Sequence, residues 1–432
     1  MNGSQSGADV IIVGAGIVGV TAAYDLAAEG HSVRLIDKGP VSDLQSSRNW
    51  GFIRRQGCDI SEMPLAAMSS KIWDDIRDDI GASSTVVKSG LVYLSPDQEN
   101  LDKYRGWMRE TRADQAFGTE LLSPEDVRSL LPSLTGEWAG GLMTPTDGHA
   151  DPGVATREIA AAAARRGVTI ETGVTVTGIR VSAGRVTGVD TTAGPRHAAR
   201  VIVAAGAWSG RLTRPLGVKI PVRWIRATAA RTNPVAHVTD LAVHVPSVGF
   251  SQTSDGSVIF GSAAWSDYDL AIDTLGDLRL FLPNFFRNRK MIQLHLNEVA
   301  FQDLGRRLTG ATRGAALFDW RRMDDPPANR RKIEMAHRNL MSLVPEWRGS
   351  RIARMWGGTV DVTPDALPVI SAVPRIEGLI LATGLSSHGF GIGPGVAKVA
   401  AELATDRAPS IDIADFRVSR FDEGPIQAHA HL

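Results

Sequence analysis

The stretch VIIVGAGIVG at residues 10–19 begins with apolar residues that suit a buried parallel strand and continues into three closely spaced glycines. A helix-compatible segment follows, and VRLID at residues 33–37 predicts a second strand that ends in Asp37. Glycine permits the tight turn, the close approach of a pyrophosphate and the packing of helix on strand; the three are Gly14, Gly16 and Gly19. The helix N-terminus can donate N–H groups to phosphates, and Asp37 can accept ribose hydroxyls. This order of elements predicts a dinucleotide-binding βαβ unit, with an ordinary glycine-rich turn as the alternative.

Composition narrows the class of protein. The chain has 432 residues, 43% hydrophobic and 22% charged, with zero formal net charge, so it can bury one large core or two and gives no reason to expect a nucleic-acid partner. Cys58 is the only cysteine, which excludes a disulfide within the chain and a cysteine-cluster zinc site and suits a reducing, cytoplasmic compartment. The tail histidines His429 and His431 are expected to lie in loose chain and to form no metal site. No signal peptide is expected, and no apolar run approaches the ~20 residues of a transmembrane segment.

Further stretches hold candidate site residues. The polar loop at residues 38–59 contains several serines, two aromatic residues and three arginines, and a loop of this length inside a compact domain is usually functional. The strand VIVAAG at residues 201–206 runs into a glycine turn, which is typical either of a cofactor contact or of a plain βα turn. GLILATG at residues 378–384 feeds a glycine-rich loop, after which Pro394 is expected to start a helix. Residues 221–320 alternate like an antiparallel sheet.

Taken in order, the motifs of this chain resemble those of the FAD-dependent amino-acid oxidoreductases, which include D-amino-acid oxidase, glycine oxidase and sarcosine oxidase. The motifs are VIIVGAGIVGVTAAYDLA with Asp37, Ser46-Ser47, DGHADPGVATREIA, VIVAAGAWS, TPDALPVIS and GLSSHGFGIGPGVAKVAAEL. The resemblance covers nearly the whole chain. The SSRNWGFIRRQG and WGGTVDVTPD versions look closest to bacterial dehydrogenases and oxidases of D-amino and N-substituted amino acids, including opine and hydroxyproline types.

The resemblance implies an α/β fold (α+β overall) in which a discontinuous Rossmann-like FAD-binding domain carries an inserted antiparallel-sheet substrate domain. The FAD-binding domain would comprise residues 1–85, 140–220 and 330–432, and the substrate domain residues 86–139 and 221–329. Both ends of the chain would complete one cofactor pocket. FAD is therefore expected rather than NAD, whose site typically lies within one continuous domain.

The resemblance also assigns the cofactor contacts. The first glycines would line the pyrophosphate, Asp37 would hold the adenosine ribose with Lys38 beside it, and Val176 would contact the adenine through its backbone. The loop at residues 388–393 would wrap the pyrimidine edge of the flavin. Gly358 stands where monomeric sarcosine oxidases carry the cysteine that attaches flavin, so FAD is expected to bind non-covalently. The expected contacts are Gly14, Gly16, Ile17, Val18, Gly19, Asp37, Lys38, Ser46, Ser47, Val176, Gly206, Trp208, Gly358, His388, Gly389, Phe390, Gly391 and Ile392.

Four residues are catalytic candidates by the same resemblance. Arg55 falls where sarcosine oxidases place an arginine for the substrate carboxylate, with Arg54 beside it, and a guanidinium fork matches a carboxylate bidentately. A salt bridge is the alternative role for these arginines. Asp361 could bind a second, cationic group of the substrate or be purely structural. His388 is assigned to the flavin, with a packing histidine as the alternative.

The implied reaction is flavin-dependent oxidation of the Cα–N bond of a D- or N-substituted amino acid. Hydride would pass to FAD, the imine would hydrolyse, and O2 or another acceptor would reoxidise the cofactor. One alternative is a flavoprotein subunit of a multi-component amino-acid dehydrogenase, and another is a flavin-dependent hydroxylase. The oligomeric state is not indicated. His244, Phe250, Trp265 and Tyr268 are candidates for the lining of the substrate site, with a core position as the alternative for each.

Overall fold

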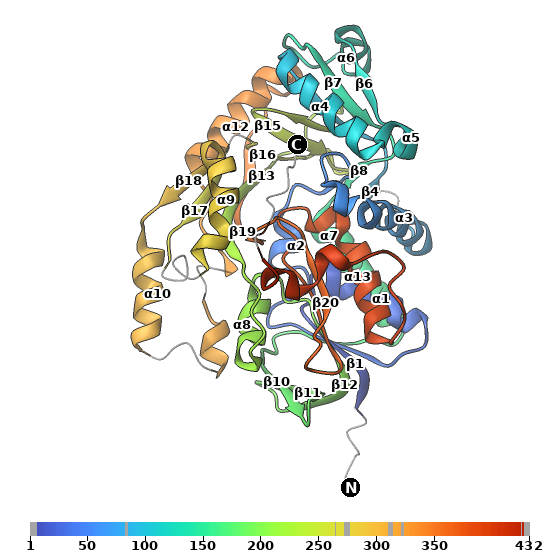
Figure 1. Ribbon diagram of the computed structural model, residues 1–432. Helices are drawn as coiled ribbons and strands as arrows, with labels where there is room; N and C mark the ends of the chain where they lie inside the picture. Colours follow the sequence, from blue (N-terminus) through green and yellow to red (C-terminus); the bar gives the residue numbers. More distant parts are fainter. Residues whose placement is uncertain are drawn as a thin grey trace.

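The computed structural model describes residues 7–82, 85–263, 265–271, 277–309, 314–320, 324–424 and 426. Its strands form an eight-stranded, a ten-stranded and a three-stranded sheet. The eight-stranded sheet lies in the lower part of the molecule in Figure 1, and the ten-stranded sheet in its upper and left-hand parts. The predicted tail histidines His429 and His431 lie outside the described residues.

Five parallel strands form the centre of the eight-stranded sheet, in the order β21-β12-β1-β2-β9. Strand β1 buries both of its faces: Val10 and Ile12 belong to one hydrophobic core, and Ile11 and Val13 belong to another. A parallel sheet that is covered on both sides requires this continuous apolar run. The strands of this sheet are β1 (Ala8–Val13), β2 (Val33–Ile36), β9 (Thr169–Glu171), β10 (Val176–Ser182), β11 (Arg185–Thr191), β12 (Arg196–Val203), β20 (Val369–Ala372) and β21 (Leu379–Thr383).

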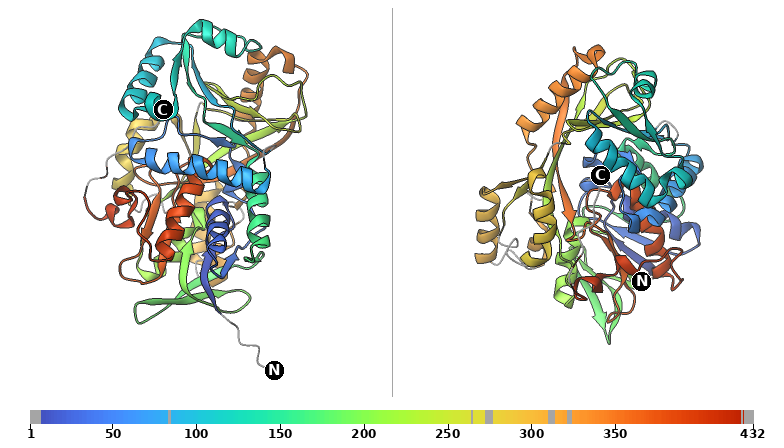
Figure 2. Two further views of the ribbon diagram at one scale, coloured as in Figure 1. Left: turned by 90° about the vertical axis from the view of Figure 1, so that its right-hand side faces the viewer. Right: turned by 45° about the horizontal axis from the view of Figure 1, so that its top comes forward.

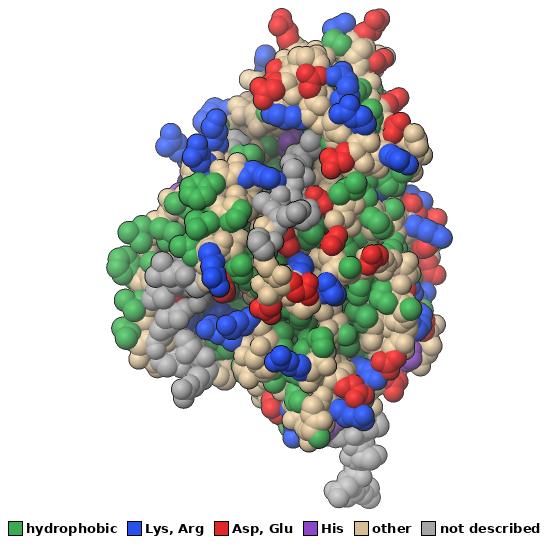
Figure 3. Space-filling model, in the orientation of Figure 1, with side chains coloured by type: hydrophobic (Ala, Val, Ile, Leu, Met, Phe, Trp, Pro, Cys, Tyr) green, Lys and Arg blue, Asp and Glu red, His purple; other side chains and the backbone are tan. Residues whose placement is uncertain are grey.

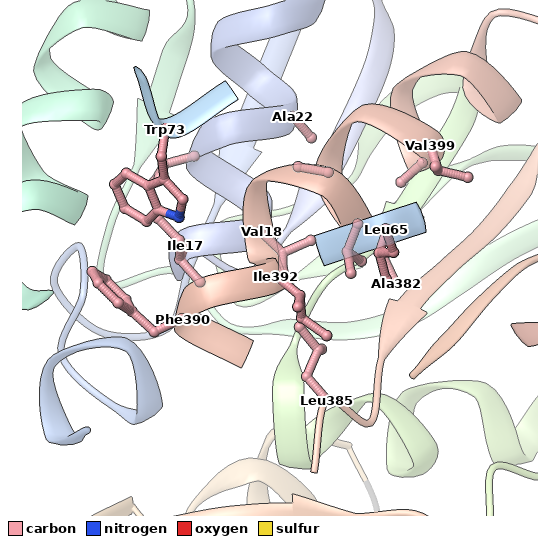
Figure 4. Close-up of a cluster of buried hydrophobic side chains, with 14 of the residues drawn as sticks. Ile17, Val18, Ala22, Leu65, Trp73, Ala382, Leu385, Phe390, Ile392 and Val399 are labelled. Atoms are coloured by element: carbon pink, nitrogen blue, oxygen red, sulfur yellow. The ribbon is translucent and has the colours of Figure 1, made fainter. Parts of the chain in front are cut away.

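A layer of helices covers one face of this sheet. It consists of α1 (Ile17–Ala28), α3 (Met63–Ile80), α7 (Pro152–Arg165) and α13 (Gly389–Ala404). Figure 4 shows the apolar side chains that α1, α3 and α13 contribute to this core. The helices approach closely because α13 presents glycine at the crossings: a Cβ on Gly393 would lie 2.9 Å from Ile17, and one on Gly395 would lie 2.8 Å from the carbonyl oxygen of Leu65.

Helix α13 begins at Gly389, five residues before Pro394, so the predicted start at the proline is wrong. Proline has no N–H to continue the hydrogen-bond ladder, and Ser69 of α3 bridges the interruption. The Ser69 hydroxyl donates to the carbonyl oxygen of Gly391 at 2.7 Å and accepts the N–H of Gly395 at 3.1 Å. Trp73 donates its Nε1–H to the same Gly391 oxygen at 3.1 Å. Contacts from another helix therefore extend α13 past its proline toward the glycine-rich loop.

The ten-stranded sheet is mainly antiparallel, and its long pair β13–β19 runs from Arg223 opposite Val362 to Thr232 opposite Ile352. Helix α12 packs on this sheet through Ile333 and Leu340. The strands are β5 (Leu91–Ser95), β6 (Glu120–Leu122), β7 (Gly140–Thr144), β13 (Arg223–Thr232), β14 (Ala242–Val245), β15 (Val248–Gln252), β16 (Val258–Gly261), β17 (Ser266–Asp269), β18 (Ile292–His295) and β19 (Ile352–Val362). The helices that accompany it are α4 (Gln98–Thr111), α5 (Ala113–Phe117), α6 (Pro124–Leu130), α9 (Leu278–Asn288), α10 (Glu298–Leu308) and α12 (Arg330–Leu343). The right-hand view of Figure 2 shows α9 and α10 at the edge of the molecule.

The strand pairing differs from the predicted domain boundaries at two places. Strands β7 and β19 fall in segments assigned to the nucleotide-binding domain, yet both are strands of the ten-stranded sheet. Their pairing partners β5 and β13 are distant in the sequence, so no local pattern could reveal the assignment. We propose a division in which residues 86–147 and 221–362 form the second domain.

The small sheet positions the loop at residues 38–59. Its strands are β3 (Phe52–Ile53), β4 (Val86–Val87) and β8 (Gly148–Ala150), and β8 pairs with both of the others. Two short helices lie in neighbouring segments: α2 (Gln45–Arg48) within this loop and α8 (Ser209–Thr213) after the glycine turn at Gly206. Within the described ranges, no helix is long and apolar enough to cross a membrane.

The crossing of α13 and α3 can be tested by adding one methyl group. Gly395→Ala places a Cβ 2.8 Å from the Leu65 carbonyl oxygen, and we expect the free energy of unfolding to fall by about 1–3 kcal/mol. Gly106→Ala in α4 is the matched control, because nothing lies within 4 Å of its added Cβ, and it should leave stability unchanged or raise it. Urea unfolding measures both; equal effects of the two substitutions would contradict the close crossing.

Candidate active site

The β1–α1 turn forms an anion-binding cradle. Gly14 has φ +110°, and a side chain there would overlap the carbonyl oxygen of Ala204. Gly16 is the N-cap of α1 and offers no side-chain acceptor, while the N–H of Ile17 donates to the hydroxyl of Ser46 at 2.8 Å. The hydroxyl of Ser46 is therefore placed at the positive end of α1, where a pyrophosphate can be bound.

Asp37 and Lys38 lie beside this cradle. The Asp37 carboxylate accepts the N–H of Ala15 at 2.6 Å and that of Gly39 at 2.8 Å, and burial raises its pKa. Its carbonyl oxygen accepts the N–H of Val174 at 3.0 Å, which brings the segment that leads into Val176 to the same place.

Lys38 is held by a cluster of its own. Its Nζ lies 2.7 Å from both carboxylate oxygens of Asp324 and 3.9 Å from the ring centroid of Trp208. The indole N–H of Trp208 donates to the same aspartate at 3.0 Å. The predicted contacts Lys38 and Trp208 therefore lie together, linked through a residue that the sequence did not indicate.

A second glycine turn lies against Gln45, the residue before Ser46. Gly206 has φ +51°, and its position leaves room for the side chain of Gln45. Gln45 accepts the N–H of Ala207 at 3.0 Å and donates to Asp361 at 2.7 Å. Buried Asp361 also accepts the N–H of Gly384 at 2.9 Å, so its oxygens are engaged by the protein, which favours the structural alternative for this residue.

The loop before α13 is strained. Ser386 and Ser387 have φ values of 49° and 71°, a left-handed conformation that non-glycine residues adopt mainly where the surrounding structure imposes it. His388 follows as the N-cap of α13, and its Nδ1 lies 3.3 Å from a carboxylate oxygen of the buried Glu62. Burial and the charge of Arg54 lower the pKa of His388 to about 3, so its imidazole is neutral.

The predicted contacts after His388 divide into backbone and side-chain roles. Phe390 and Ile392 are buried in the core with Trp73 and Ile17, as Figure 4 shows, so only their backbone can reach a cofactor. At Gly391 an added Cβ would lie 3.2 Å from the backbone nitrogen of Arg54. The closing loop and the loop at residues 38–59 are thus packed backbone to backbone.

The two neighbouring arginines have different surroundings. Arg55 is 7% exposed and forms an ion pair with Asp147, which is 1% exposed, with 3.0 Å between Nε and Oδ1. It also donates to Thr146, and its guanidinium lies 4.4 Å from the ring centroid of Phe117. Burial raises the pKa of Asp147, and the charge of Arg55 opposes that shift. These contacts favour the salt-bridge alternative for Arg55.

Arg54 faces a different set of groups and is only half-buried. Among the described residues, its guanidinium hydrogen-bonds only to the carbonyl oxygen of Gln56. Its charge acts on three aromatic groups. Burial and the charge of Arg54 together lower the pKa of His244 to about 4 and also lower the pKa of His388. Burial raises the pKa of Tyr93, and the charge of Arg54 opposes this rise. Arg54 is therefore a cation whose charge acts on His244, Tyr93 and His388. The carboxylates of Glu62 and Asp147 act on it in turn, although it forms no ion pair with a carboxylate in the described part of the chain.

Tyr93 and His244, on which the charge of Arg54 acts, belong to an aromatic row. His244 lies 4.4 Å from the ring centroid of Tyr93 and 6.4 Å from that of Trp50, with small interplanar angles. Trp50 fits against the sheet because β15 and β16 offer glycine there; a Cβ on Gly249 would lie 2.7 Å from the indole. Of the predicted lining residues, His244 is thus near Arg54, whereas Phe250 packs in the core, 5.5 Å from Trp347.

The other two predicted lining residues lie elsewhere on the second sheet. Trp265 is half-buried, with Lys332 5.5 Å from its ring centroid, and Tyr268 is in β17, which pairs with β18.

Sequence reasoning placed Trp50 in the loop at residues 38–59 without giving it a role, and it missed Gln45, Glu62, Tyr93 and Asp147. Asp147 belongs to the DGHADP motif, and an acid in a motif that accompanies two arginines could have suggested an ion pair. The others carry no local pattern, because their contacts join distant segments.

Comparison with known proteins identifies the cofactor. A family profile described as FAD dependent oxidoreductase matches residues 9–403. The chain belongs to this family. It is 26% identical to a D-amino acid dehydrogenase of Cereibacter sphaeroides, covering 95% of each chain, and 27% identical to a sarcosine oxidase subunit beta of Rhizobium meliloti, covering 96% of this chain and 89% of the relative. A solved structure of an L-amino acid deaminase from Proteus myxofaciens has a TM-score of 0.90 at 25% identity, covering 98% of this chain and 95% of the other.

The residues present fit the cofactor of this FAD-dependent oxidoreductase. A Cβ on Gly16 would lie 2.9 Å from the Ser46 hydroxyl, and one on Gly14 would fill the turn, so both positions need glycine if phosphate is to approach. The backbone N–H of Ser42 donates to the Ala15 carbonyl oxygen at 3.0 Å, whereas the buried hydroxyl of Ser42 has no hydrogen-bond partner in the described part of the chain. An unpartnered buried hydroxyl beside the cradle is explained by a ligand acceptor. The adenosine and pyrophosphate ends of FAD would thus be held by the residues around Gly14–Gly19 and Asp37.

A measurement of stability tests whether the ion pair of Arg55 has a structural role that is independent of catalysis. Arg55→Ala leaves the buried Asp147 carboxylate uncompensated, so we expect the free energy of unfolding to fall by about 3–5 kcal/mol. The double substitution Arg55→Ala with Asp147→Asn should recover part of this loss. Arg338→Ala, at an exposed position, is the control and should change stability by less than about 0.5 kcal/mol. A loss below about 1 kcal/mol for Arg55→Ala would argue against a structural pair.

Proposed function

We propose that this FAD-dependent oxidoreductase oxidises the Cα–N bond of an amino acid whose carboxylate binds to Arg54. The observation that carries the proposal is a guanidinium whose only hydrogen-bond partner among the described residues is a backbone carbonyl oxygen. Its charge acts on His388 of the closing loop and on His244 of the aromatic row. The names of the relatives support an amino-acid substrate, since they include a D-amino acid dehydrogenase and an L-amino acid deaminase.

Arg54 is better suited than Arg55 to hold a substrate. A carboxylate that bound to Arg55 would have to displace Asp147, which also accepts the backbone N–H groups of Arg55 at 3.0 Å and Gln56 at 3.1 Å. Arg54 needs no such exchange, and its planar fork can bind both oxygens of a carboxylate. This contact fixes the substrate's Cα relative to the closing loop at residues 384–392.

The chain's own groups favour a substrate that binds with a neutral amine. The pKa values of His244 and His388 are lowered to about 4 and about 3, so neither imidazole is a strong enough base to take a proton from an ammonium group near neutral pH. The positive charge of Arg54 further disfavours a second cation beside it. Bound FAD supplies the two-electron acceptor for the hydride on Cα. The residues supply orientation and a site shielded by Trp50, Tyr93 and His244.

The remaining features of the proposal concern location and the electron acceptor. A single buried cysteine, Cys58, suits a reducing compartment, so we place the protein in the cytoplasm. The reduced cofactor is reoxidised by O2 or by a separate acceptor. Oxygen consumption and anaerobic dye reduction on the same preparation distinguish these two routes.

We propose that FAD binds non-covalently. Gly358 supplies no nucleophile, and it packs where a Cβ would lie 2.9 Å from Arg48. The thiol of Cys58 is buried, and burial raises its pKa, so it is a poor nucleophile. Acid precipitation should therefore release all of the yellow colour into the supernatant. Flavin that stays with the pellet would contradict the proposal.

The reaction is tested by anaerobic bleaching of the flavin. Purified holoenzyme is mixed without oxygen with a panel of D-, L-, N-methyl, N-carboxyalkyl and cyclic amino acids. At least one class should bleach the flavin absorbance within seconds of mixing. Consumption of NADPH without bleaching by any amino acid would instead indicate a hydroxylase and overturn the proposal.

Substitution of Arg54 tests the carboxylate contact on the substrate found in this way. Arg54→Leu should lower kcat/KM by roughly 30- to 1,000-fold, equivalent to about 2–4 kcal/mol, while FAD remains bound. Arg54→Lys should retain part of kcat/KM, because lysine keeps the positive charge but lacks the planar fork of arginine. Arg338→Leu is the matched control and should leave kcat/KM unchanged. An unaltered KM in Arg54→Leu would remove Arg54 from the substrate site.

A further inference from the structure

One region holds most of the exposed large apolar side chains of the described chain. Nine of the twelve lie between residues 278 and 308, in α9, β18, α10 and the segments that join them. We call this set the apolar face: Leu278, Leu282, Phe286, Met291, Leu294, Leu296, Phe301, Leu304 and Leu308. In Figure 3 hydrophobic side chains gather along the left-hand side of the molecule, where Figure 1 places α9, α10 and β18. A concentration of this kind marks an interaction surface.

The spacing of these residues shows that whole helix faces are turned outward. Leu278, Leu282 and Phe286 follow one another at intervals of four along α9. In α10 Phe301, Leu304 and Leu308 are spaced by three and four and are 69%, 45% and 78% exposed. Such spacing places each set on one side of its helix, which in an ordinary globular protein is the side that is buried.

The inward contacts of the same region include several polar ones. In α10 the buried positions are Val299 and Asp303. In α9 Asn284 donates to the carbonyl oxygen of Pro364 at 3.2 Å, and in β18 His295 lies 2.8 Å from the buried Asp267. The region is therefore fastened to the rest of the molecule by these polar contacts and by Val299, which belongs to the same hydrophobic core as Phe318 and Trp320. Its apolar face is left for another surface.

Positive charge accompanies the apolar face. Residues 277–309 contain six Arg or Lys and three Asp or Glu, a net charge of +3 in a chain whose net charge is zero. Arg279, Arg289 and Lys290 are exposed, and none of them forms an ion pair with a carboxylate of the described residues. Two copies of this surface placed face to face would bring like charges together, whereas an anionic surface would neutralise them.

We propose that the apolar face docks on the surface of a bilayer that contains anionic phospholipids. Phenylalanine and leucine side chains on one side of two helices, with exposed basic residues beside them, are the features of helices that lie in the membrane interface. The basic residues add attraction to anionic headgroups. Docking is peripheral, in keeping with the absence of a membrane-spanning helix from the described residues.

The experiment is vesicle sedimentation with the full-length holoenzyme. Wild type should bind vesicles of phosphatidylglycerol and phosphatidylcholine at least about ten-fold more tightly than vesicles of phosphatidylcholine alone. Phe286→Ser with Phe301→Ser and Leu308→Ser should lower the affinity at least about ten-fold. The matched control carries Leu130→Ser and Val181→Ser, two exposed apolar positions outside the face, and should bind as wild type does.

Charge reversal provides an independent arm. Arg289→Glu with Lys290→Glu should reduce binding to the anionic vesicles at least about ten-fold and leave the weak binding to neutral vesicles unchanged. Arg338→Glu with Lys219→Glu, at exposed positions elsewhere, is the control. Retained FAD absorbance and the unfolding temperature show that each variant is folded; the substituted side chains are all exposed.

Two results would overturn the proposal. Wild type that remains in the supernatant with anionic vesicles shows that the face does not bind lipid. Light scattering that finds a dimer, dispersed by the triple serine substitution without any vesicle binding, assigns the face to a second copy of this chain. Neither result bears on the oxidation of amino acids, which is measured separately by bleaching of the flavin.

Discussion

The buried ion pair between Arg55 and Asp147 is the interaction on which the candidate active site depends. It fastens the loop at residues 38–59 to the segment that joins β7 and β8, and the aspartate also accepts the backbone N–H groups of Arg55 and Gln56. With Arg55 committed to this contact, its neighbour Arg54 is left to face His244, Tyr93 and His388. In the proposed reaction, this salt bridge occupies Arg55 and leaves Arg54, whose guanidinium hydrogen-bonds only to the Gln56 carbonyl oxygen among the described residues, to bind the substrate carboxylate.

The same loop is held from its other side by the helix layer. Gly391 lies against the backbone of Arg54, and Ser69 and Trp73 of α3 hold the Gly391 carbonyl oxygen. The positions that admit this close packing are glycines, and the proline that interrupts α13 is accommodated because a serine from another helix replaces the missing ladder contact. The same contacts between α3 and α13 therefore pack the core and hold the glycine-rich loop in place.

The second sheet combines two tasks. Its strand β19, paired along its length with β13, carries the predicted site residues Gly358 and Asp361, and its edge strand β18 carries part of the apolar face. Asn284 of α9 contacts the carbonyl oxygen of Pro364, three residues after Asp361. Helix α9, which carries part of the apolar face, is therefore in direct contact with the segment that follows β19.

The sequence alone determined the nucleotide-binding unit, its family and its cofactor, because the order of strand, glycines, helix and acid depends on neighbouring residues and on backbone conformations that only glycine permits. The start of α13, the membership of β7 and β19 in the second sheet and the different surroundings of Arg54 and Arg55 were decided by tertiary structure. Each of these depends on a partner far away in the chain: Ser69 for α13, β5 and β13 for the strands, Asp147 for the arginines. The periodicity of α9 and α10 likewise predicts two amphipathic helices, but only the packed structure shows that their apolar sides face outward, since a sequence pattern records which residues share a face and not what that face meets.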